Sequence, residues 1–241
     1  TGWGLWEPEG GAFPRSQRRS PAPLPRLPHG FPPAEAMAIG TAGYTAALCV
    51  LALQDFGALN DKTGEFLVTG AAGGVGSVAG ALLAALGLRV TASTGRPQEQ
   101  DFLTGLGAAA LLDRNELSAP GKPLQPERWS AAVDAVGSHT LANVLAQTRY
   151  GGAVAACGLA QGPDLPATVM PHILRGVALL GVDSVMVPQV KRARAWDLLD
   201  RHLDRAKLAG LTVTAPMSAL PDLAQKIVAG QLRGRTVIEI V

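Results

Sequence analysis

A glycine-rich turn between an apolar run and a small-residue segment is the feature that most constrains this chain. Residues 66–69 have the composition of a buried strand, residues 70–76 read Gly-Ala-Ala-Gly-Gly-Val-Gly, and residues 75–86 are small and apolar, as in a helix packed closely on a sheet. Glycines let the backbone approach a pyrophosphate, and the first N–H groups of the helix favour an anion. The pattern predicts a dinucleotide-binding βα unit, although glycines also serve plain strand-to-helix turns.

The end of the next apolar run, residues 88–93, indicates which dinucleotide is bound. An NAD-binding unit of this kind places a carboxylate there to accept a hydrogen bond from the ribose 2′-hydroxyl. Here the run is followed by Thr94, Gly95 and Arg96, which offer two donor side chains and no negative charge to repel a 2′-phosphate. The sequence predicts NADP(H) as cofactor. The alternative is that Arg96 is an ordinary solvated arginine before a helix.

Length and charge exclude several classes of protein. With 241 residues, 47% of them hydrophobic, the chain can bury one full α/β core and a small appendage. A net charge of +2 and scattered arginines make no basic stripe for nucleic acid. No uninterrupted apolar stretch reaches the roughly 18 residues of a membrane span, and no signal-peptide pattern opens the chain. We expect a small-molecule substrate, and neither nucleic acid nor a membrane as partner.

The cysteines and histidines predict no metal site. Cys49 and Cys157 each lie inside an apolar run, which suits two buried thiols in a reducing cytoplasm better than a disulfide. The four histidines have no cysteine or carboxylate at ligand spacing. We therefore expect a cytoplasmic protein that works without zinc.

The chain divides into three predicted parts. Residues 1–32 are interrupted by prolines and arginines and are expected to be irregular. Residues 33–210 begin with a helical pattern that breaks near Gly40 and Gly43, and then alternate between apolar strands and helices. Residues 211–241 read as strand, helix and strand.

The alternation predicts an α/β fold, a Rossmann-type doubly wound parallel sheet with helices on both faces. Six strands are expected at residues 66–69, 89–93, 109–112, 131–136, 152–157 and 177–182. Helices are expected between them at residues 75–86, 98–106 and 141–148, followed by one amphipathic helix over residues 190–208. In the last part we expect strands at residues 211–214 and 235–240 around a helix at residues 220–229.

Short-chain dehydrogenases also carry a glycine turn of this kind, but their chemistry is absent. They need a tyrosine acid with a lysine four residues later to lower its pKa. Here Tyr44 is followed at that distance by Leu48, and Tyr150 by Val154. Neither tyrosine can serve that role.

The motifs, taken together over residues 27–241, resemble the medium-chain dehydrogenase/reductase superfamily, and within it the YhdH-type quinone oxidoreductases and acryloyl-CoA reductases. They stand at residues 39–46, 70–76, 94–96, 134–137, 150–152, 156–159, 181–186 and 234–236. The resemblance implies a zinc-independent, NADPH-dependent oxidoreductase that reduces the carbon–carbon double bond of a small α,β-unsaturated thioester, acryloyl-CoA. It also implies a homodimer for the full-length parent.

The resemblance implies roles for individual residues. The pyrophosphate turn would consist of Ala72, Gly73, Gly74 and Val75, and the 2′-phosphate site of Thr94, Gly95 and Arg96. Further cofactor contacts would come from Thr45, Arg114, Cys157, Gly158, Leu159, Asp183 and Ser184. Tyr44 and Arg235 are the polar groups expected to face the nicotinamide. Structural alternatives stay open, since Cys157 resembles a small buried hydrophobe, Asp183 a cap and Arg114 a surface charge.

Members of this family begin with a GroES-like catalytic domain, and we expect most of that domain to be missing here. Residues 211–241 would be its C-terminal remnant. Residues 2–4 match the family's last barrel motif, but residues 5–26 replace strand residues with proline and arginine. We hypothesise a compensated frameshift, which an intact reading frame in the encoding DNA would refute.

Three functions therefore stay open at this point. The first is the enoyl-thioester reductase implied by the resemblance, and the second is a zeta-crystallin-like quinone oxidoreductase. The third is a catalytically incomplete NADP-binding fragment.

Overall fold

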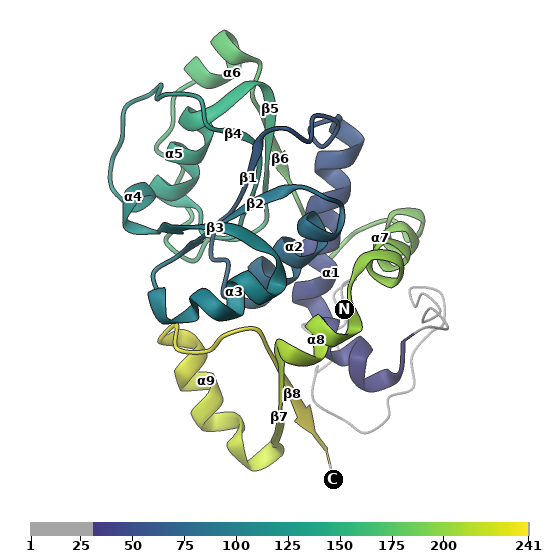
Figure 1. Ribbon diagram of the computed structural model, residues 1–241. Coiled ribbons are helices and arrows are strands. Elements are labelled where there is room, and N and C mark those ends of the chain that lie inside the picture. The colour runs from purple at the N-terminus through teal and green to yellow at the C-terminus, as the bar shows by residue number, and fades with distance from the viewer. Residues whose placement is uncertain (1–30, 241) are drawn as a thin grey trace.

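A computed structural model describes residues 31–240 of the chain (Figure 1). The expected irregular segment lies outside the described residues except for its last two positions, and the hypothesised frameshift lies outside them entirely.

Six parallel strands form the central sheet, in the order β3-β2-β1-β4-β5-β6. They are β1 (Glu65–Val68), β2 (Arg89–Thr94), β3 (Ala108–Asp113), β4 (Trp129–Asp134), β5 (Thr148–Ala156) and β6 (Ala178–Gly181). Because helices cover both faces, the strands are near-continuous apolar runs rather than alternating ones. Strand order reverses between β1 and β4, where a doubly wound sheet binds its ligands. The predicted Rossmann-type fold is confirmed.

Helices cover both faces of this sheet (Figure 1). The longer helices of the described chain are α1 (Pro33–Phe56), α2 (Gly74–Ala85), α5 (Ser138–Gln147), α7 (Gln189–His202) and α9 (Leu220–Val228), of which α9 lies outside the sheet layers. The shorter ones are η1 (Pro97–Glu99), α3 (Gln100–Leu106), α4 (Asn115–Ser118), α6 (Met170–Arg175), α8 (Arg205–Gly210) and η2 (Met217–Ala219). Helices α4 and α6 are additions to the predicted set, because they have only four and six residues and carry little periodicity.

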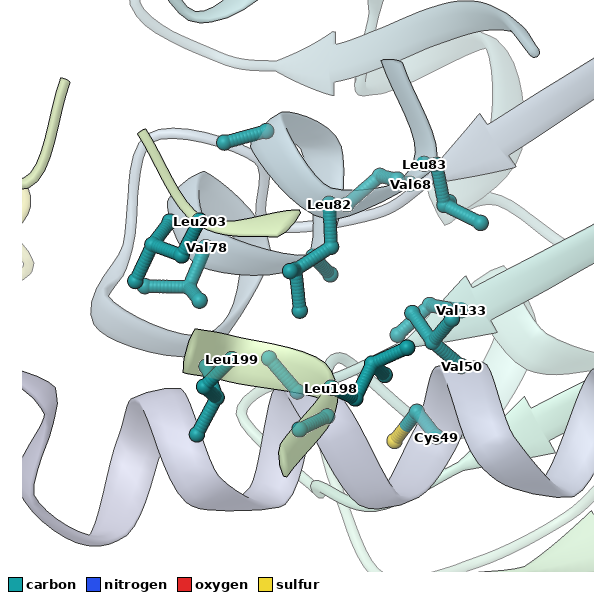
Figure 2. Packing of buried hydrophobic residues seen from close by; sticks show 14 of the residues in the cluster. Cys49, Val50, Val68, Val78, Leu82, Leu83, Val133, Leu198, Leu199 and Leu203 are labelled. Carbon is teal, nitrogen blue, oxygen red and sulfur yellow. The ribbon is translucent and has the colours of Figure 1, made fainter. Parts of the chain in front are cut away.

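The larger part of the core lies between the sheet and helices α1, α2 and α7. Figure 2 shows side chains from these elements converging, with Val68 and Val133 from the sheet, Leu82 from α2, Cys49 from α1 and Leu199 from α7. All five side chains are buried. The smaller cluster, on the other face, packs α4 and α5 against the sheet around Trp129. Two helix layers thus hold the carboxyl ends of the strands in place.

Helix α1 combines a kink with an apolar middle. Gly40 has φ 50° and ψ −154°, outside the helical region, at one of the two predicted breaks. By length and composition α1 would also qualify as a membrane span, although no uninterrupted apolar stretch of that length is present in the sequence. Its packing in the core requires the same composition, since residues 43–51 are buried throughout.

The predicted single helix over residues 190–208 is wrong. The structure has two helices, α7 and α8, because Asp204 adopts an extended conformation and its carboxylate accepts hydrogen bonds from the backbone N–H groups of Ala206 and Lys207. A capping aspartate at that position starts a new helix and changes the chain direction.

The last part of the chain forms a separate βαβ unit. Strand β7 (Thr212–Pro216) pairs in parallel with β8 (Arg235–Glu239), and α9 connects them. Figure 1 shows this unit beside α3 and α8, away from the six-stranded sheet. Residues 227–235, which lead into β8, reach back to the carboxyl edge of that sheet.

Candidate cofactor site

A cavity of about 650 Å³ lies at the carboxyl edge of the sheet, over the point where strand order reverses. Its walls are the glycine turn, the end of β2, the loop after β4 and the segment that leads into β8. This volume lies in the range of cavities that hold cofactors and other small molecules.

The glycine turn forms the floor of the cavity through close backbone contacts. Gly70 has φ 57°, and its carbonyl accepts a hydrogen bond from the Gly73 N–H at 2.9 Å. A Cβ atom at Gly76 would collide with backbone atoms of Gly70 and Ala71. Helix α2 begins at Gly74 and, within the described chain, has no side-chain cap. The floor therefore presents backbone N–H groups and a helix N-terminus to an anion.

A buried hydrogen-bond network joins the floor to the neighbouring wall. The Thr69 hydroxyl donates to Asp134 Oδ1 at 2.6 Å and accepts from the Ala135 N–H at 3.1 Å. Asp134 Oδ2 accepts from the Gly137 N–H at 2.8 Å. Burial raises the pKa of Asp134, while these donors oppose the rise. The network fixes the ends of β1 and β4 relative to each other.

The loop after β4 is held in a strained conformation. Ser138 has φ 47°, the one positive value for a non-glycine residue in the described chain. Thr140 donates through its N–H and its hydroxyl to Gln161 Oε1. Both Thr140 and Gln161 line the cavity, and neither was predicted as a site residue. The motif at residues 134–137 was the available signal, because it stands immediately before Ser138.

Two arginines meet at the end of β2. Arg114 lies across Gly95, where a Cβ atom would collide with the guanidinium, and the Arg114 N–H donates to the Thr94 carbonyl at 3.0 Å. The Arg96 N–H donates to the Thr94 hydroxyl at 3.1 Å, and Arg96 Nη1 donates to the Leu232 carbonyl at 3.0 Å. These contacts bring the side chains of Arg96 and Arg114 to one end of the cavity.

Arg235 contributes a third cation, beside the glycine turn. Its Nε donates to the Ala38 carbonyl at 2.7 Å, and its guanidinium lies where a Cβ atom at Gly40 or Gly74 would stand. Burial lowers the pKa of this arginine. Among the described residues that line the cavity, the charged ones are these three arginines, so the cavity is suited to an anion.

The structure brings only some of the predicted site residues together. Those that line the cavity are Ala72, Gly73, Gly74, Val75, Thr94, Gly95, Arg96, Arg114 and Arg235. The others lie outside its lining: Tyr44, Thr45, Cys157, Gly158, Leu159, Asp183 and Ser184. Most of these follow β5 and β6, farther along the same edge of the sheet.

Tyr44 is buried away from the cavity. Its ring stacks on Trp196 at 6.3 Å between centroids, and the guanidinium of Arg192 lies 4.9 Å from the ring centroid. The hydroxyl has no hydrogen-bond partner among the described residues. Burial raises the pKa of Tyr44, against a lowering by the charge of Arg192. In this conformation the phenol is not positioned to face a cofactor in the cavity.

The remaining predicted residues make local contacts. The Thr45 hydroxyl donates to the Thr41 carbonyl at 2.8 Å, as is common inside a helix. Asp183 accepts from the N–H groups of Val185 and Met186, so it caps a turn.

Cys157 and Cys49 interact with each other. A hydrogen bond from Cys49 lowers the pKa of the Cys157 thiol, whereas that bond and burial raise the pKa of Cys49. No group of three or more potential metal ligands occurs among residues 31–240.

Comparison with known proteins identifies relatives of this chain. Residues 74–201 match the family model described as zinc-binding dehydrogenase. Over its whole length the chain is 49% identical to acrylyl-CoA reductase AcuI of Ruegeria pomeroyi, of which it covers 73%. It is 46% identical to the probable acrylyl-CoA reductase AcuI of Escherichia coli, of which it covers 74%. Over 89% of the chain it is 40% identical to the putative quinone oxidoreductase YhfP of Bacillus subtilis, of which it covers 65%.

Solved structures show the same relationship. The YhdH oxidoreductase of Salmonella enterica in complex with NADP superposes with a TM-score of 0.87 at 49% identity, over 89% of this chain and 66% of that one. YhdH of Escherichia coli with bound NADPH gives 0.86 at 47% identity, over the same shares. The chain thus spans about two thirds of the length of these structures. By fold, family model and sequence identity, the chain belongs to the medium-chain dehydrogenase/reductase superfamily.

Proposed function

We propose that this chain is the cofactor-binding part of an NADPH-dependent oxidoreductase that reduces the carbon–carbon double bond of a small α,β-unsaturated thioester such as acryloyl-CoA. The observation that carries the proposal is the cavity over the glycine turn, whose charged lining residues are three arginines. The two relatives named acrylyl-CoA reductases support the choice of substrate.

The three arginines suggest how NADPH would lie. The diphosphate would rest on the N–H groups of the glycine turn and beside Arg235, whose guanidinium lies next to Gly74. The 2′-phosphate would lie between Arg96 and Arg114, where guanidinium groups offer forked donors. We propose that the predicted strand-end residues Cys157, Gly158, Leu159, Asp183 and Ser184, together with Thr45, border the nicotinamide half. Tyr44 is assigned no proton-transfer role.

Reduction of the double bond needs a hydride and a proton. When bound, the reduced nicotinamide is the hydride source for the β-carbon. The described residues hold the cofactor in place, and the Thr69–Asp134 network orients the wall beside it. A proton must then reach the α-carbon, and donors beside the thioester oxygen would stabilise the enolate. We propose that these groups belong to a catalytic domain of which residues 211–241 form the C-terminal part, beside a nucleotide-binding domain at residues 33–210.

Titration with both cofactors tests the cofactor assignment. Loss of charge-assisted hydrogen bonds to a phosphate costs about 1.5–3 kcal/mol, so Arg96→Ala should weaken NADPH binding about 10- to 100-fold. NADH binding should change far less, because NADH lacks the 2′-phosphate. Equal losses for the two cofactors would contradict the assignment.

A second candidate function is quinone reduction. The 40% identity to the putative quinone oxidoreductase YhfP favours it, and YhfP has been solved with NAD bound. NADPH oxidation in the presence of acryloyl-CoA and of a benzoquinone separates the two candidates. A preference for acryloyl-CoA supports the reductase, whereas a preference for the quinone contradicts it. Tight NADPH binding without turnover of either substrate would indicate a cofactor-binding fragment.

We also propose a homodimer in the cytoplasm. Strand β6 is an edge of the sheet, and the preceding segment exposes the apolar side chains of Val169, Ile173 and Leu174. Both cysteines are free thiols, as expected in a reducing compartment. Light scattering of the protein and of an Ile173→Glu variant tests the dimer, which the charge should disrupt.

A further inference from the structure

We infer that Arg233 is a specificity-determining residue for the cofactor, because it neutralises the carboxylate of Glu99 beside the arginines of the proposed 2′-phosphate site. The inference rests on the proposed NADPH site. Neither Arg233 nor Glu99 lines the cavity, so both would act through their charge and through the residues next to them.

Glu99 is a carboxylate at an unexpected place. It is the last residue of η1, five positions after the end of β2, and its N–H donates to the Arg96 carbonyl at 3.0 Å. Its side chain is only 12% exposed. The carboxylate that rejects a 2′-phosphate in NAD-binding units stands at the end of the second strand, and Glu99 lies one short helix beyond that position. Its negative charge would still repel a nearby phosphate. The Glu99 carboxylate, three positions after Arg96, would therefore oppose NADPH binding unless its charge were compensated.

Arg233 supplies the compensating charge. Its Nη1 lies 2.8 Å from Glu99 Oε2, and its guanidinium lies 5.0 Å from the centroid of the Phe102 ring. Glu99 and Phe102 belong to consecutive helices, η1 and α3, so Arg233 binds the segment that follows Arg96 at two points. The ion pair gives the Glu99 carboxylate a cationic partner.

The neighbours of Arg233 extend this effect to the cavity. The Leu232 carbonyl accepts from Arg96 Nη1 at 3.0 Å, and the Gly234 N–H donates to the Ala72 carbonyl at 3.0 Å. Arg233 thus stands between one residue that orients Arg96 and another that contacts the glycine turn. The C-terminal βαβ unit would influence the choice of nucleotide without itself contacting the 2′-phosphate.

Four proteins test the inference by fluorescence titration with NADPH and NADH: the wild type, Arg233→Met, Glu99→Gln and the double variant. At low ionic strength, Arg233→Met should weaken NADPH binding about fivefold to tenfold, because the Glu99 carboxylate then lacks its cation and repels the 2′-phosphate through space. NADH binding should change less than about twofold. Glu99→Gln should leave NADPH binding equal or tighter, and the double variant should regain most of the loss.

Other results would overturn the inference. If Arg233 only anchors the segment that follows Arg96, Arg233→Met should weaken the binding of NADPH and of NADH alike, and adding Glu99→Gln should not restore NADPH binding. Should Arg233→Met fail to fold, a comparison of Arg233→Lys with Glu99→Gln still tests the inference. Arg233→Lys keeps the positive charge and should keep the preference for NADPH. Loss of that preference in Arg233→Lys contradicts the inference. A wild type without a preference for NADPH would instead contradict the proposed function.

Discussion

The buried contact between Thr69 and Asp134 yields the most demanding test of how the site is built. Thr69→Val keeps the shape of the side chain and removes its hydroxyl. Asp134, which is 0% exposed, then loses the donor at 2.6 Å, and the Ala135 N–H loses its acceptor. A hydrogen bond to a charged group is worth about 1.5–3 kcal/mol, and an orphaned buried N–H costs about 1 kcal/mol or more. The free energy of unfolding should fall by about 2–4 kcal/mol at neutral pH.

The pH dependence of this loss identifies its cause. Burial already raises the folded-state pKa of Asp134 above its ordinary value, and loss of the Thr69 donor raises it further. The folded protein then binds more protons than the unfolded chain between the ordinary and the raised pKa, so stability decreases as pH rises through this window. The difference between Thr69→Val and wild type should therefore be larger at neutral pH than at a pH below the ordinary pKa of an aspartate.

Urea unfolding monitored by circular dichroism gives these free energies. Thr69→Ser is the matched control, because it keeps the hydroxyl and should lose only about 1 kcal/mol for the missing methyl group. A Thr69→Val variant within about 0.5 kcal/mol of the wild type at neutral pH would refute the reasoning, because a contact with a buried carboxylate cannot be that weak. So would a deficit that does not shrink in acid.

Three further predictions concern the turn, the helix break and the thiols. Gly76→Ala should lower the free energy of urea unfolding by about 1–3 kcal/mol, because the added Cβ would collide with backbone atoms. Gly80→Ala in the same helix is the control, since open space surrounds that position and the change should be neutral or stabilising. Asp204→Ala should lower the free energy of unfolding by about 1 kcal/mol, because the helix cap is lost, whereas Asp204→Asn should retain most of the stability that the cap provides. Equal losses in the two variants would contradict the capping role. Iodoacetamide should label Cys157 before Cys49, because Cys157 is more exposed and its pKa is lowered; mass spectrometry showing Cys49 labelled first would contradict this.

The parts of the fold that the sequence predicts are those set by local patterns. The strands of the parallel sheet are continuous apolar runs because both of their faces are buried, and the glycine turn marks the start of α2 within one residue. The split between α7 and α8 escaped prediction because the apolar stripe continues through Leu203, which is buried although it lies outside the helix. Asp204 was the available signal, since aspartate is a favoured N-cap residue.

The cofactor site, too, was predicted from the sequence only where local patterns define it. The motifs around Gly74 and Arg96 are short, and each predicts its part of the proposed phosphate-binding half from adjacent residues alone. The wall formed by residues 227–235 was not predicted, because it depends on long-range contacts such as that between Arg96 and the Leu232 carbonyl, 136 positions apart. No local pattern pairs Arg233 with Glu99 either, because the βαβ unit must first pack beside η1 and α3.

We propose that NADPH lies on the glycine turn with its 2′-phosphate between Arg96 and Arg114. A crystal structure of this chain with NADP⁺ tests it directly. We expect the diphosphate over the Gly73–Gly74 backbone beside Arg235, and guanidinium nitrogens of both Arg96 and Arg114 within about 3.2 Å of the 2′-phosphate oxygens. A cofactor bound elsewhere, or a 2′-phosphate that contacts neither Arg96 nor Arg114, would contradict the account.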